Sequence, residues 1–179
     1  GPHNHANTMT ALLTVDALTH DISLAIEAAK SFEPLSHRLE FVAIINGISF
    51  YNDSKATNTD SVRSALTSFD QPIRVIMGGS DKGEDFSVLT ELLKQRARKV
   101  YLTGGTMAKL RAAWKGKLEL DCVDDFETCI RAAFADSVPG DIVVLSPACA
   151  SFDHFRNYEH RGEVFKEIVH RIRSEYEKE

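Results

Sequence analysis

Three polar loops, each directly after a strand-like apolar run, constrain this chain more than any other feature. The loops and the runs before them are 52–58 after 47–51, 78–83 after 73–77, and 146–153 after 141–145. In an open α/β sheet, ligands bind in the crevice beyond the carboxyl ends of the strands. We therefore expect the three loops to form one shared site. Two of them carry a lysine and the third carries hydroxyl groups, which favours an anionic ligand such as a carboxylate or a phosphate.

Strand-like and helix-like segments alternate along most of the chain. The dipeptide Asn46-Gly47 between two β-rich runs is the strongest short signal for a hairpin. The expected strands are 38–45, 48–52, 73–77, 100–102, 118–123 and 142–145, and the expected helices are 4–17, 22–30, 59–69, 86–96, 107–114, 126–135 and 163–178. Such alternation implies right-handed crossovers between parallel strands. We predict an α/β fold: a Rossmann-like three-layer domain whose mixed, mostly parallel sheet has about six strands, with the first strand antiparallel through the hairpin.

The only candidate domain boundary lies near residues 31–36, around the turn Phe32-Glu33-Pro34. The two helices expected before it have no core of their own. We therefore predict that residues 1–33 are the terminal helices of a preceding domain or a linker, and that residues 34–179 form the domain that carries the three loops. A total of 179 residues fits one domain with a fragment of another.

Composition excludes several classes of function. The formal net charge of -5 argues against nucleic acid as the main partner. No apolar run approaches the ~20 residues of a membrane span. The three cysteines, Cys122, Cys129 and Cys149, lack the spacing of a zinc module and suit a reducing cytosol, so we expect a cytoplasmic protein with buried cysteines and no metal site of its own. The chain also lacks the Gly-Lys-Ser/Thr of a phosphate-binding P-loop.

The first two loops combine a lysine with features that suit an anion. Lys55 lies where a strand ends and a helix begins, so Ser54, Lys55 and Thr57 together predict an anion site at a helix N-terminus. In the second loop, the glycine pair 78–79 lets the backbone approach a ligand, and Lys82 supplies a point charge beyond it. The alternative for both loops is a simple turn with a solvated lysine.

The third loop favours carboxylate binding over hydrolysis. Ser146 and Ser151 flank a turn of small residues, and a triad of Ser151, Asp153 and His154 can be drawn. The loop has no Gly-x-Ser-x-Gly elbow, however, and sequence neighbours rarely meet the geometry of a triad. The aromatic residues near this loop, Phe152 and Tyr158 among them, are expected to be core or pocket wall.

Several of these segments together resemble the C-terminal domain of the bacterial Mur ligases, and most closely the branch that adds D-glutamate to UDP-N-acetylmuramoyl-L-alanine. The segments that carry the resemblance are His3-Asn4-His5-Ala6-Asn7, His37-Arg38-Leu39-Glu40, Asn52-Asp53-Ser54-Lys55-Ala56-Thr57-Asn58, and Leu145-Ser146-Pro147-Ala148-Cys149-Ala150-Ser151-Phe152-Asp153 with Phe155, Asn157, Glu159, Arg161-Gly162 and Phe165 after it. They occur in the order of the family and cover essentially the whole chain. One departure is Tyr158, where the family pattern has Phe.

The resemblance implies an ATP-dependent amide ligase of peptidoglycan precursor synthesis that works through an acyl phosphate. Its upstream N-terminal and central domains would bind UDP-N-acetylmuramoyl-L-alanine, ATP and most of the Mg²⁺, and residues 1–33 would end the central ATPase domain. The chain alone is expected to be inactive. By resemblance, the catalytic residues are Lys55 and Lys82, the D-glutamate site comprises Thr57, Lys82, Ser151, Phe152 and Tyr158, and the nucleotide site comprises Asn4, Asn7, Arg38, Asp53 and Lys55.

Two alternatives stay open at this point. The chain can belong to a related ligase that takes another amino acid, such as a folylpolyglutamate-type enzyme. It can also be a non-catalytic module that binds anions.

Overall fold

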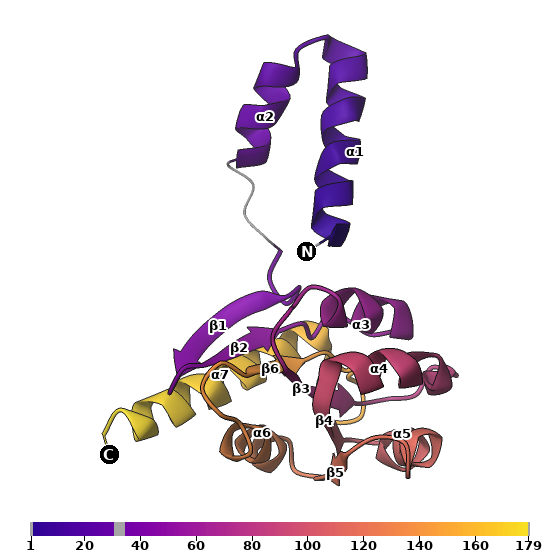
Figure 1. The fold of residues 1–179 in the computed structure, drawn as a ribbon, viewed down its shortest axis with the longest axis vertical. Helices are drawn as coiled ribbons and strands as arrows, with labels where there is room; N and C mark the ends of the chain where they lie inside the picture. Colours follow the sequence, from indigo (N-terminus) through magenta and orange to yellow (C-terminus); the bar gives the residue numbers. More distant parts are fainter. Residues whose placement is uncertain (1, 31–34, 179) are drawn as a thin grey trace. The chain divides into compact units, whose positions relative to one another are not determined.

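The computed structural model describes residues 2–30 and 35–178, with side chains in the first helix from Asn7 onward. The chain divides into two compact units, Gly1–Leu35 and Ser36–Glu179 (Figure 1). The first unit is a helical hairpin of α1 (Pro2–Thr19) and α2 (Ile22–Lys30). Ala25 is the only side chain buried among the described residues of this unit.

The second unit is built on one six-stranded sheet with the strand order β1-β2-β6-β3-β4-β5. The strands are β1 (Glu40–Ile45), β2 (Ile48–Asn52), β3 (Ile73–Gly78), β4 (Ala97–Thr103), β5 (Leu120–Cys122) and β6 (Ile142–Leu145). The β1 and β2 strands pair antiparallel, and the β2-β6, β6-β3, β3-β4 and β4-β5 pairs are parallel. The prediction of a mixed, mostly parallel sheet with an antiparallel first strand is therefore confirmed.

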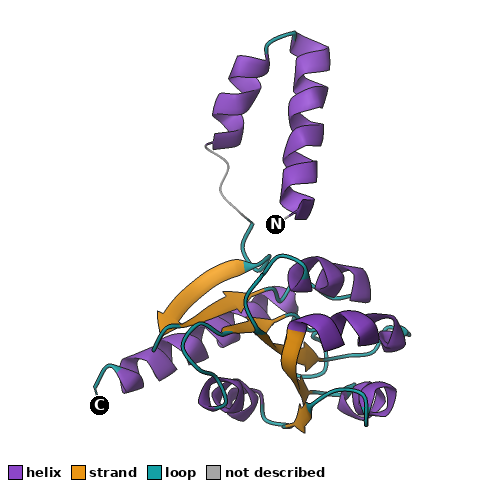
Figure 2. Cartoon of the chain, viewed as in Figure 1, coloured by secondary structure: helices purple, strands orange, loops and turns teal. Residues whose placement is uncertain are grey.

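Helices cover both faces of this sheet (Figure 2). They are α3 (Thr59–Leu66), the 3-10 turn η1 (Phe86–Leu89), α4 (Thr90–Arg96), α5 (Met107–Trp114), α6 (Phe126–Ala135) and α7 (Tyr158–Tyr176). One core joins the sheet to α3, η1, α4 and α5, and a second joins the opposite face to α6 and α7. The three layers follow from the alternation of side chains along each buried strand: in β3, Val75 and Met77 belong to the first core and Ile76 to the second.

Side-chain caps explain where several of the helices begin. Asn58 accepts a hydrogen bond from Ser61 N ahead of α3, and Asp125 accepts one from Thr128 N ahead of α6. Asn157 caps α7 in the same way, so this helix begins at Tyr158 rather than at the predicted Glu163. At the other end of the domain, β1 begins at Glu40 rather than at residue 38, because His37 and Leu39 adopt positive φ angles of 64° and 46°.

One expectation about burial was wrong. Cys122 is exposed, since it ends the short β5 strand at the edge of the sheet, whereas Cys129 and Cys149 are buried as predicted. Phe152 was expected in the core or in a pocket wall, and its exposed fraction of 71% excludes the core. Within the described residues, no helix combines the length and the apolar character needed to cross a membrane.

Candidate functional site

The three polar loops meet at the carboxyl ends of β2, β3 and β6. The Ser146 hydroxyl donates to Asp53 Oδ2 at 2.8 Å, which joins the first loop to the third. Gly78 N donates to Pro147 O at 2.9 Å, and Ser80 N donates to Ala150 O at 2.8 Å, which joins the second loop to the third. The shared location predicted from the sequence is thus present, because the adjacent strands β2, β6 and β3 end at the same edge of the sheet.

Arg161, a buried arginine on α7, forms hydrogen bonds to all three loops. Arg161 is 2% exposed. Its guanidinium donates to oxygen atoms of all three loops: Ser54 Oγ at 2.9 Å, Ser54 O at 2.9 Å, Cys149 O at 3.0 Å, Ala150 O at 3.1 Å and Gly78 O at 3.5 Å. Burial lowers the pKa of this guanidinium to about 10. The fixed fork of an arginine suits this task, since it presents five N–H donors in one plane.

The second loop depends on glycine for its path. Gly78 and Gly79 have φ angles of +129° and +140°, which side-chain-bearing residues rarely adopt. A Cβ on Gly79 would lie 2.1 Å from Ala150 O, and one on Gly78 would lie 1.8 Å from Thr103 O. The glycine pair therefore allows close packing of the second loop against the third, as well as against the end of β4.

Asp53 occupies the junction between the first and third loops. Asp53 is 5% exposed, and its carboxylate accepts hydrogen bonds from the Ser146 hydroxyl at 2.8 Å and from Leu39 N at 3.2 Å. Burial raises the pKa of Asp53 to about 7, even though these two hydrogen bonds and the charge of Arg38 lower it. A carboxylate can accept further bonds at its other lone pairs, so Asp53 can still receive a hydroxyl donor from a ligand.

Lys55 lies on the ring of Tyr158. Its Nζ is 5.7 Å from the centroid of that ring, within range of a cation–π interaction. The backbone of Tyr158 is fixed as well, since its carbonyl accepts a hydrogen bond from Ser54 Oγ at 2.8 Å. Lys55 makes no ion pair with any residue in the described ranges, and its ammonium thus keeps its capacity to bind an anion.

The remaining predicted residues of the second and third loops differ in exposure. Lys82 is exposed and makes neither a hydrogen bond nor an ion pair with residues that the structure describes. Ser151 is 2% exposed, and its carbonyl accepts a bond from Phe155 N at 2.9 Å. The exposed side chain of Phe152 follows directly, so this loop presents a buried hydroxyl beside an apolar ring.

Thr57 and Arg38 complete the set around the first loop. Thr57 is half-buried, and its N–H donates to Lys55 O at 2.9 Å. Arg38 is exposed, and its charge partly offsets two raised pKa values, that of Asp53, which burial raises, and that of Tyr158, which the hydrogen bond with Glu159 raises. The site therefore has three cationic side chains, Arg38, Lys55 and Lys82, around a small hydroxyl-bearing surface.

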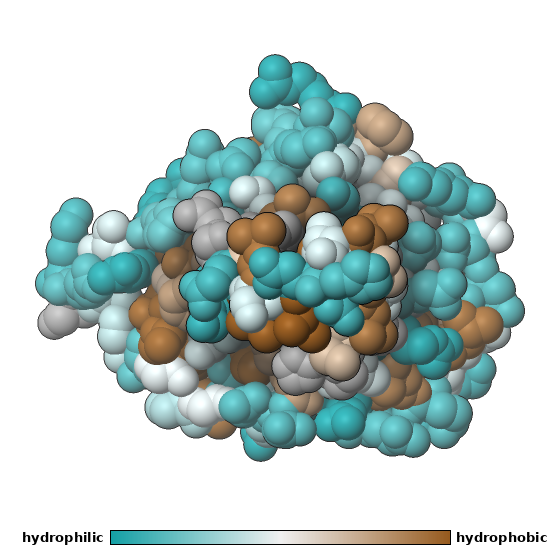
Figure 3. Space-filling view, turned by 90° about the horizontal axis from the view of Figure 1, so that it is seen from above, coloured by the Kyte–Doolittle hydropathy of each residue, from teal (hydrophilic) through white to brown (hydrophobic). Residues whose placement is uncertain are grey.

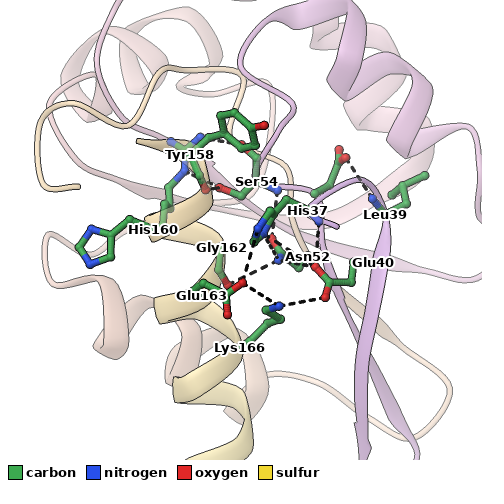
Figure 4. Close-up of polar contacts among 12 residues, drawn as sticks. His37, Leu39, Glu40, Asn52, Ser54, Tyr158, His160, Gly162, Glu163 and Lys166 are labelled. Carbon is green, nitrogen blue, oxygen red and sulfur yellow. Dashed lines mark hydrogen bonds and ion pairs between the residues drawn. The ribbon is translucent and has the colours of Figure 1, made fainter. Parts of the chain in front are cut away.

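A polar network behind the first loop ties it to the start of the domain and to α7 (Figure 4). Asn52 Nδ2 lies 3.0 Å from both Glu40 Oε2 and His37 Nδ1. Lys166 on α7 donates to Glu40 Oε1 at 3.0 Å and pairs with Glu163 at 2.9 Å. This network lies beside the anion site and joins the turn at residues 37–40, the end of β2 and α7.

A cavity of about 410 Å³ lies beyond the ends of β3 and β4, on the α6 side of the glycine pair. Its lining includes the glycine pair itself, the acidic residues Asp124, Asp125 and Asp153, and Arg161, but none of the lysines or hydroxyl residues predicted to bind a ligand. The three acidic residues make this cavity less suited to an anion than the loops that carry Lys55 and Lys82.

The two asparagines predicted to contact a nucleotide belong to the first unit. Asn7 is exposed and lines an apolar cavity between α1 and α2, whereas the side chain of Asn4 lies outside the described residues. Among the residues that the structure describes, no group of three or more His, Cys, Asp or Glu side chains could hold a metal ion.

Sequence reasoning missed Arg161 and Asn52 as organising residues. Arg161 had appeared only as part of the Arg161-Gly162 motif, and nothing in the sequence shows which carbonyl groups a buried guanidinium meets. The helix cap at Asn157 was the available signal, because it extends α7 to include Arg161.

Comparison with known proteins agrees with this architecture. The family model described as Mur ligase, glutamate ligase domain, matches residues 37–149. A UDP-N-acetylmuramoylalanine–D-glutamate ligase from Koribacter versatilis is 41% identical over 178 residues, which cover 99% of this chain and 39% of that protein. The chain therefore spans about two fifths of the length of this relative.

Solved structures with low sequence identity share the fold. UDP-N-acetylmuramate–alanine ligase from Thermotoga maritima has a TM-score of 0.68 at 16% identity and covers 97% of this chain and 38% of its own. Folylpolyglutamate synthase from Mycobacterium tuberculosis has a TM-score of 0.66 at 17% identity and covers 92% of this chain and 40% of its own. Since the family model matches more than half of its residues, this chain belongs to the Mur ligase family.

Proposed function

We propose that this chain is the C-terminal, amino-acid-binding part of an ATP-dependent ligase that adds D-glutamate to UDP-N-acetylmuramoyl-L-alanine in peptidoglycan precursor synthesis. The observation that carries the proposal is the group of Arg38, Lys55 and Lys82 around the three loops, since none of them pairs with a carboxylate side chain at ion-pair distance in the described part of the chain. The name of the curated relative supports the choice of substrates. A cytoplasmic location is part of the same proposal.

The amino acid would be held by its carboxylates. Lys82 would pair with one carboxylate of D-glutamate, and the hydroxyls of Thr57 and Ser151 would donate to these groups, with the backbone near Phe152 and Tyr158 assisting. Binding by the carboxylates leaves the amine free to attack the acyl phosphate of the other substrate. Fixing the amine in attack geometry supplies much of the catalysis in such a reaction.

The other two cations would face the nucleotide. Arg38 and Lys55 would neutralise phosphate oxygens, and charge compensation of this kind stabilises phosphoryl transfer. Asp53 would accept a hydrogen bond from the ribose, while Asn4 and Asn7 would lie against adenine. The resemblance assigns Mg²⁺ mainly to the upstream domain, and the proposal keeps that assignment.

The helical hairpin is best explained as the end of that upstream domain. Its described part has one buried side chain, Ala25, and several large exposed apolar ones: Met9, Leu13, Leu18, Ile22, Leu24 and Ile26. Figure 3 views the molecule from the end where α1 and α2 join, and it shows hydrophobic atoms among hydrophilic ones. Two helices cannot enclose a core of their own, so the rest of the ATPase domain would cover these side chains.

Two alternatives are weighed against this proposal. A folylpolyglutamate-type ligase would have the same fold, because such a synthase matches with a TM-score of 0.66. The higher sequence identity to a D-glutamate ligase favours the first assignment. A non-catalytic anion-binding module would need no upstream domain, whereas the chain matches only 39% of its curated relative.

The proposal is tested by measuring phosphate release from ATP in the presence of UDP-N-acetylmuramoyl-L-alanine. The polypeptide that carries the upstream domains should release phosphate with D-glutamate and not with L-glutamate, while the 179-residue chain alone should release none. Equal rates with both enantiomers would favour another amino acid. Activity of the chain alone would contradict the assignment of ATP binding to the upstream domain.

A further inference from the structure

Asn52 is a fully buried polar residue to which the proposed function assigns no task. It is the last residue of β2 and the first of the loop that carries Asp53 and Lys55, and its exposed fraction is 0%. Its Oδ1 accepts a hydrogen bond from Ser54 N at 3.1 Å, which turns the chain sharply after the strand. Its amide group therefore faces in two directions, toward its own loop and toward the start of the domain.

The side-chain NH₂ group of Asn52 forms hydrogen bonds to the turn of residues 37–40. Nδ2 lies 3.0 Å from Glu40 Oε2 and 3.0 Å from His37 Nδ1, with Gly162 O on α7 at 3.5 Å (Figure 4). Since Nδ2 can only donate, His37 Nδ1 must accept, and the imidazole proton is then on Nε2. That nitrogen lies 3.5 Å from Glu163 Oε1.

The turn of residues 37–40 is strained and is the first part of the second unit. His37 and Leu39 both have positive φ angles without being glycine, a conformation that persists only where surrounding contacts over-determine it. Glu40 Oε2 accepts His37 N at 2.8 Å, in addition to the Asn52 amide. Asn52 and Glu40 thus hold this turn together.

The same turn contacts the two charged residues of the first loop. Lys55 N donates to His37 O at 3.0 Å, and Leu39 N donates to Asp53 Oδ1 at 3.2 Å. Hydrogen bonds therefore connect Asn52 to His37 in the turn, and His37 in turn to Lys55, three residues after Asn52. Any displacement of the turn would move Lys55 and Asp53 with it.

We propose that Asn52 is a positioning residue for the ligation: it locks the loop of Asp53 and Lys55 to the turn at which the chain enters this unit. The inference rests on the proposed function, in which the upstream ATPase domain precedes this turn. Lys55 then moves together with the turn of residues 37–40 and not independently of it. An amide is required, because only an amide can donate to Glu40 and His37 while it accepts from Ser54 N.

The test measures amide hydrogen exchange in the 179-residue chain and steady-state kinetics in the polypeptide with its upstream domains. In Asn52→Leu, exchange at Lys55 and Leu39 should accelerate at least ~10-fold, while exchange at Val75 in β3 should change less than ~2-fold. The kcat should fall ~10-fold or more, and the KM for D-glutamate should rise by a smaller factor than the kcat falls, since Lys82 and Ser151 lie on other loops and only Thr57 shares the loop of Lys55. Asn58→Asp, which preserves the cap of α3 in the same loop, is the control and should change neither measurement.

A second variant separates the amide donor from the bulk of the side chain. Asn52→Asp keeps an acceptor for Ser54 N but removes the donor to Glu40 and His37, and it places a carboxylate beside Glu40 Oε2. Exchange at Lys55 should therefore accelerate in Asn52→Asp as well, while exchange at Val75 stays within ~2-fold. Unchanged exchange at Lys55 in Asn52→Leu, or equal acceleration at Val75, would overturn the proposal. An unaltered polypeptide that forms no amide would overturn the proposed function, whereas the exchange comparison would still decide whether Asn52 holds the loop.

Discussion

Arg161 Nε donates a hydrogen bond to the Ser54 hydroxyl at 2.9 Å, and this bond connects α7 to the first loop across 107 positions of sequence. The other donors of the guanidinium bind carbonyl groups of Ser54, Gly78, Cys149 and Ala150. No carboxylate lies among these acceptors. The charge of Arg161 is therefore used to organise backbone, and the three loops of the site share one internal support.

Replacing Arg161 should destabilise the domain strongly. Arg161→Met keeps an apolar stem but leaves buried carbonyl groups without donors, each of which costs ~1–3 kcal/mol. We expect a loss of roughly 3–5 kcal/mol in the free energy of unfolding, measured by chemical denaturation. The control is Arg156→Met, which removes an exposed arginine just before the same helix and should cost less than ~0.5 kcal/mol. A loss below ~1 kcal/mol in Arg161→Met would contradict the assigned role of Arg161.

Two glycines of the second loop should respond differently to the same substitution. Gly79→Ala brings a Cβ to 2.1 Å from Ala150 O, which the packed third loop cannot accommodate. Gly83→Ala meets nothing within 4 Å, although its φ of +85° still disfavours alanine. Thermal unfolding should show a small decrease in Tm for Gly83→Ala, since ~1–2 kcal/mol corresponds to a few degrees in a domain of this size. The decrease in Tm for Gly79→Ala should be at least twice as large. Equal decreases in Tm for the two variants would show that the second loop is not tightly packed against the third.

Asp53 should make stability depend on pH. Burial raises its pKa from 3.8 to about 7, so the folded state retains a proton that the unfolded chain releases. The stabilising contribution is then fully present below pH ~4 and is lost as the pH rises to ~7, by a few kcal/mol at most. The free energy of unfolding of the unaltered chain, relative to that of Asp53→Asn, should therefore decrease between pH 5 and pH 8. A constant difference across this range would mean that Asp53 is ionised throughout.

Much of the fold followed from local patterns of sequence. The limits of α5, α6 and β6 were predicted to the residue, because each has a clear apolar pattern or a clear start signal. The early start of α7 was missed, since Asn157, the residue that could have signalled it as a cap, follows a loop rich in turn residues. The exposure of Cys122 was missed because residue type alone does not show that β5 ends the sheet.

The candidate site was only partly predictable, for a different reason. Loops that follow adjacent strands must meet, so the convergence of the three loops could be inferred from strand positions. Arg161 meets Ser54 across 107 positions of sequence, and Asn52 meets Glu40 and His37 across 12 and 15 positions. No local pattern of the sequence encodes these contacts. The assignment of Lys82 to an amino acid and of Arg38 to a nucleotide comes from the resemblance and stays a prediction.

That assignment is tested most directly by steady-state kinetics of Lys82→Ala and Arg38→Ala in the polypeptide that carries the upstream domains. Both residues are exposed, so neither change should alter stability by more than ~0.5 kcal/mol. Lys115→Ala, at the exposed end of α5, is the control for the loss of a surface lysine. Lys82→Ala should raise the KM for D-glutamate at least ~10-fold and leave the KM for ATP nearly unchanged, since removing one charge-assisted contact costs ~1.5–3 kcal/mol. Arg38→Ala should show the opposite pattern, and equal effects of either variant on both substrates would contradict the division of the site between amino acid and nucleotide.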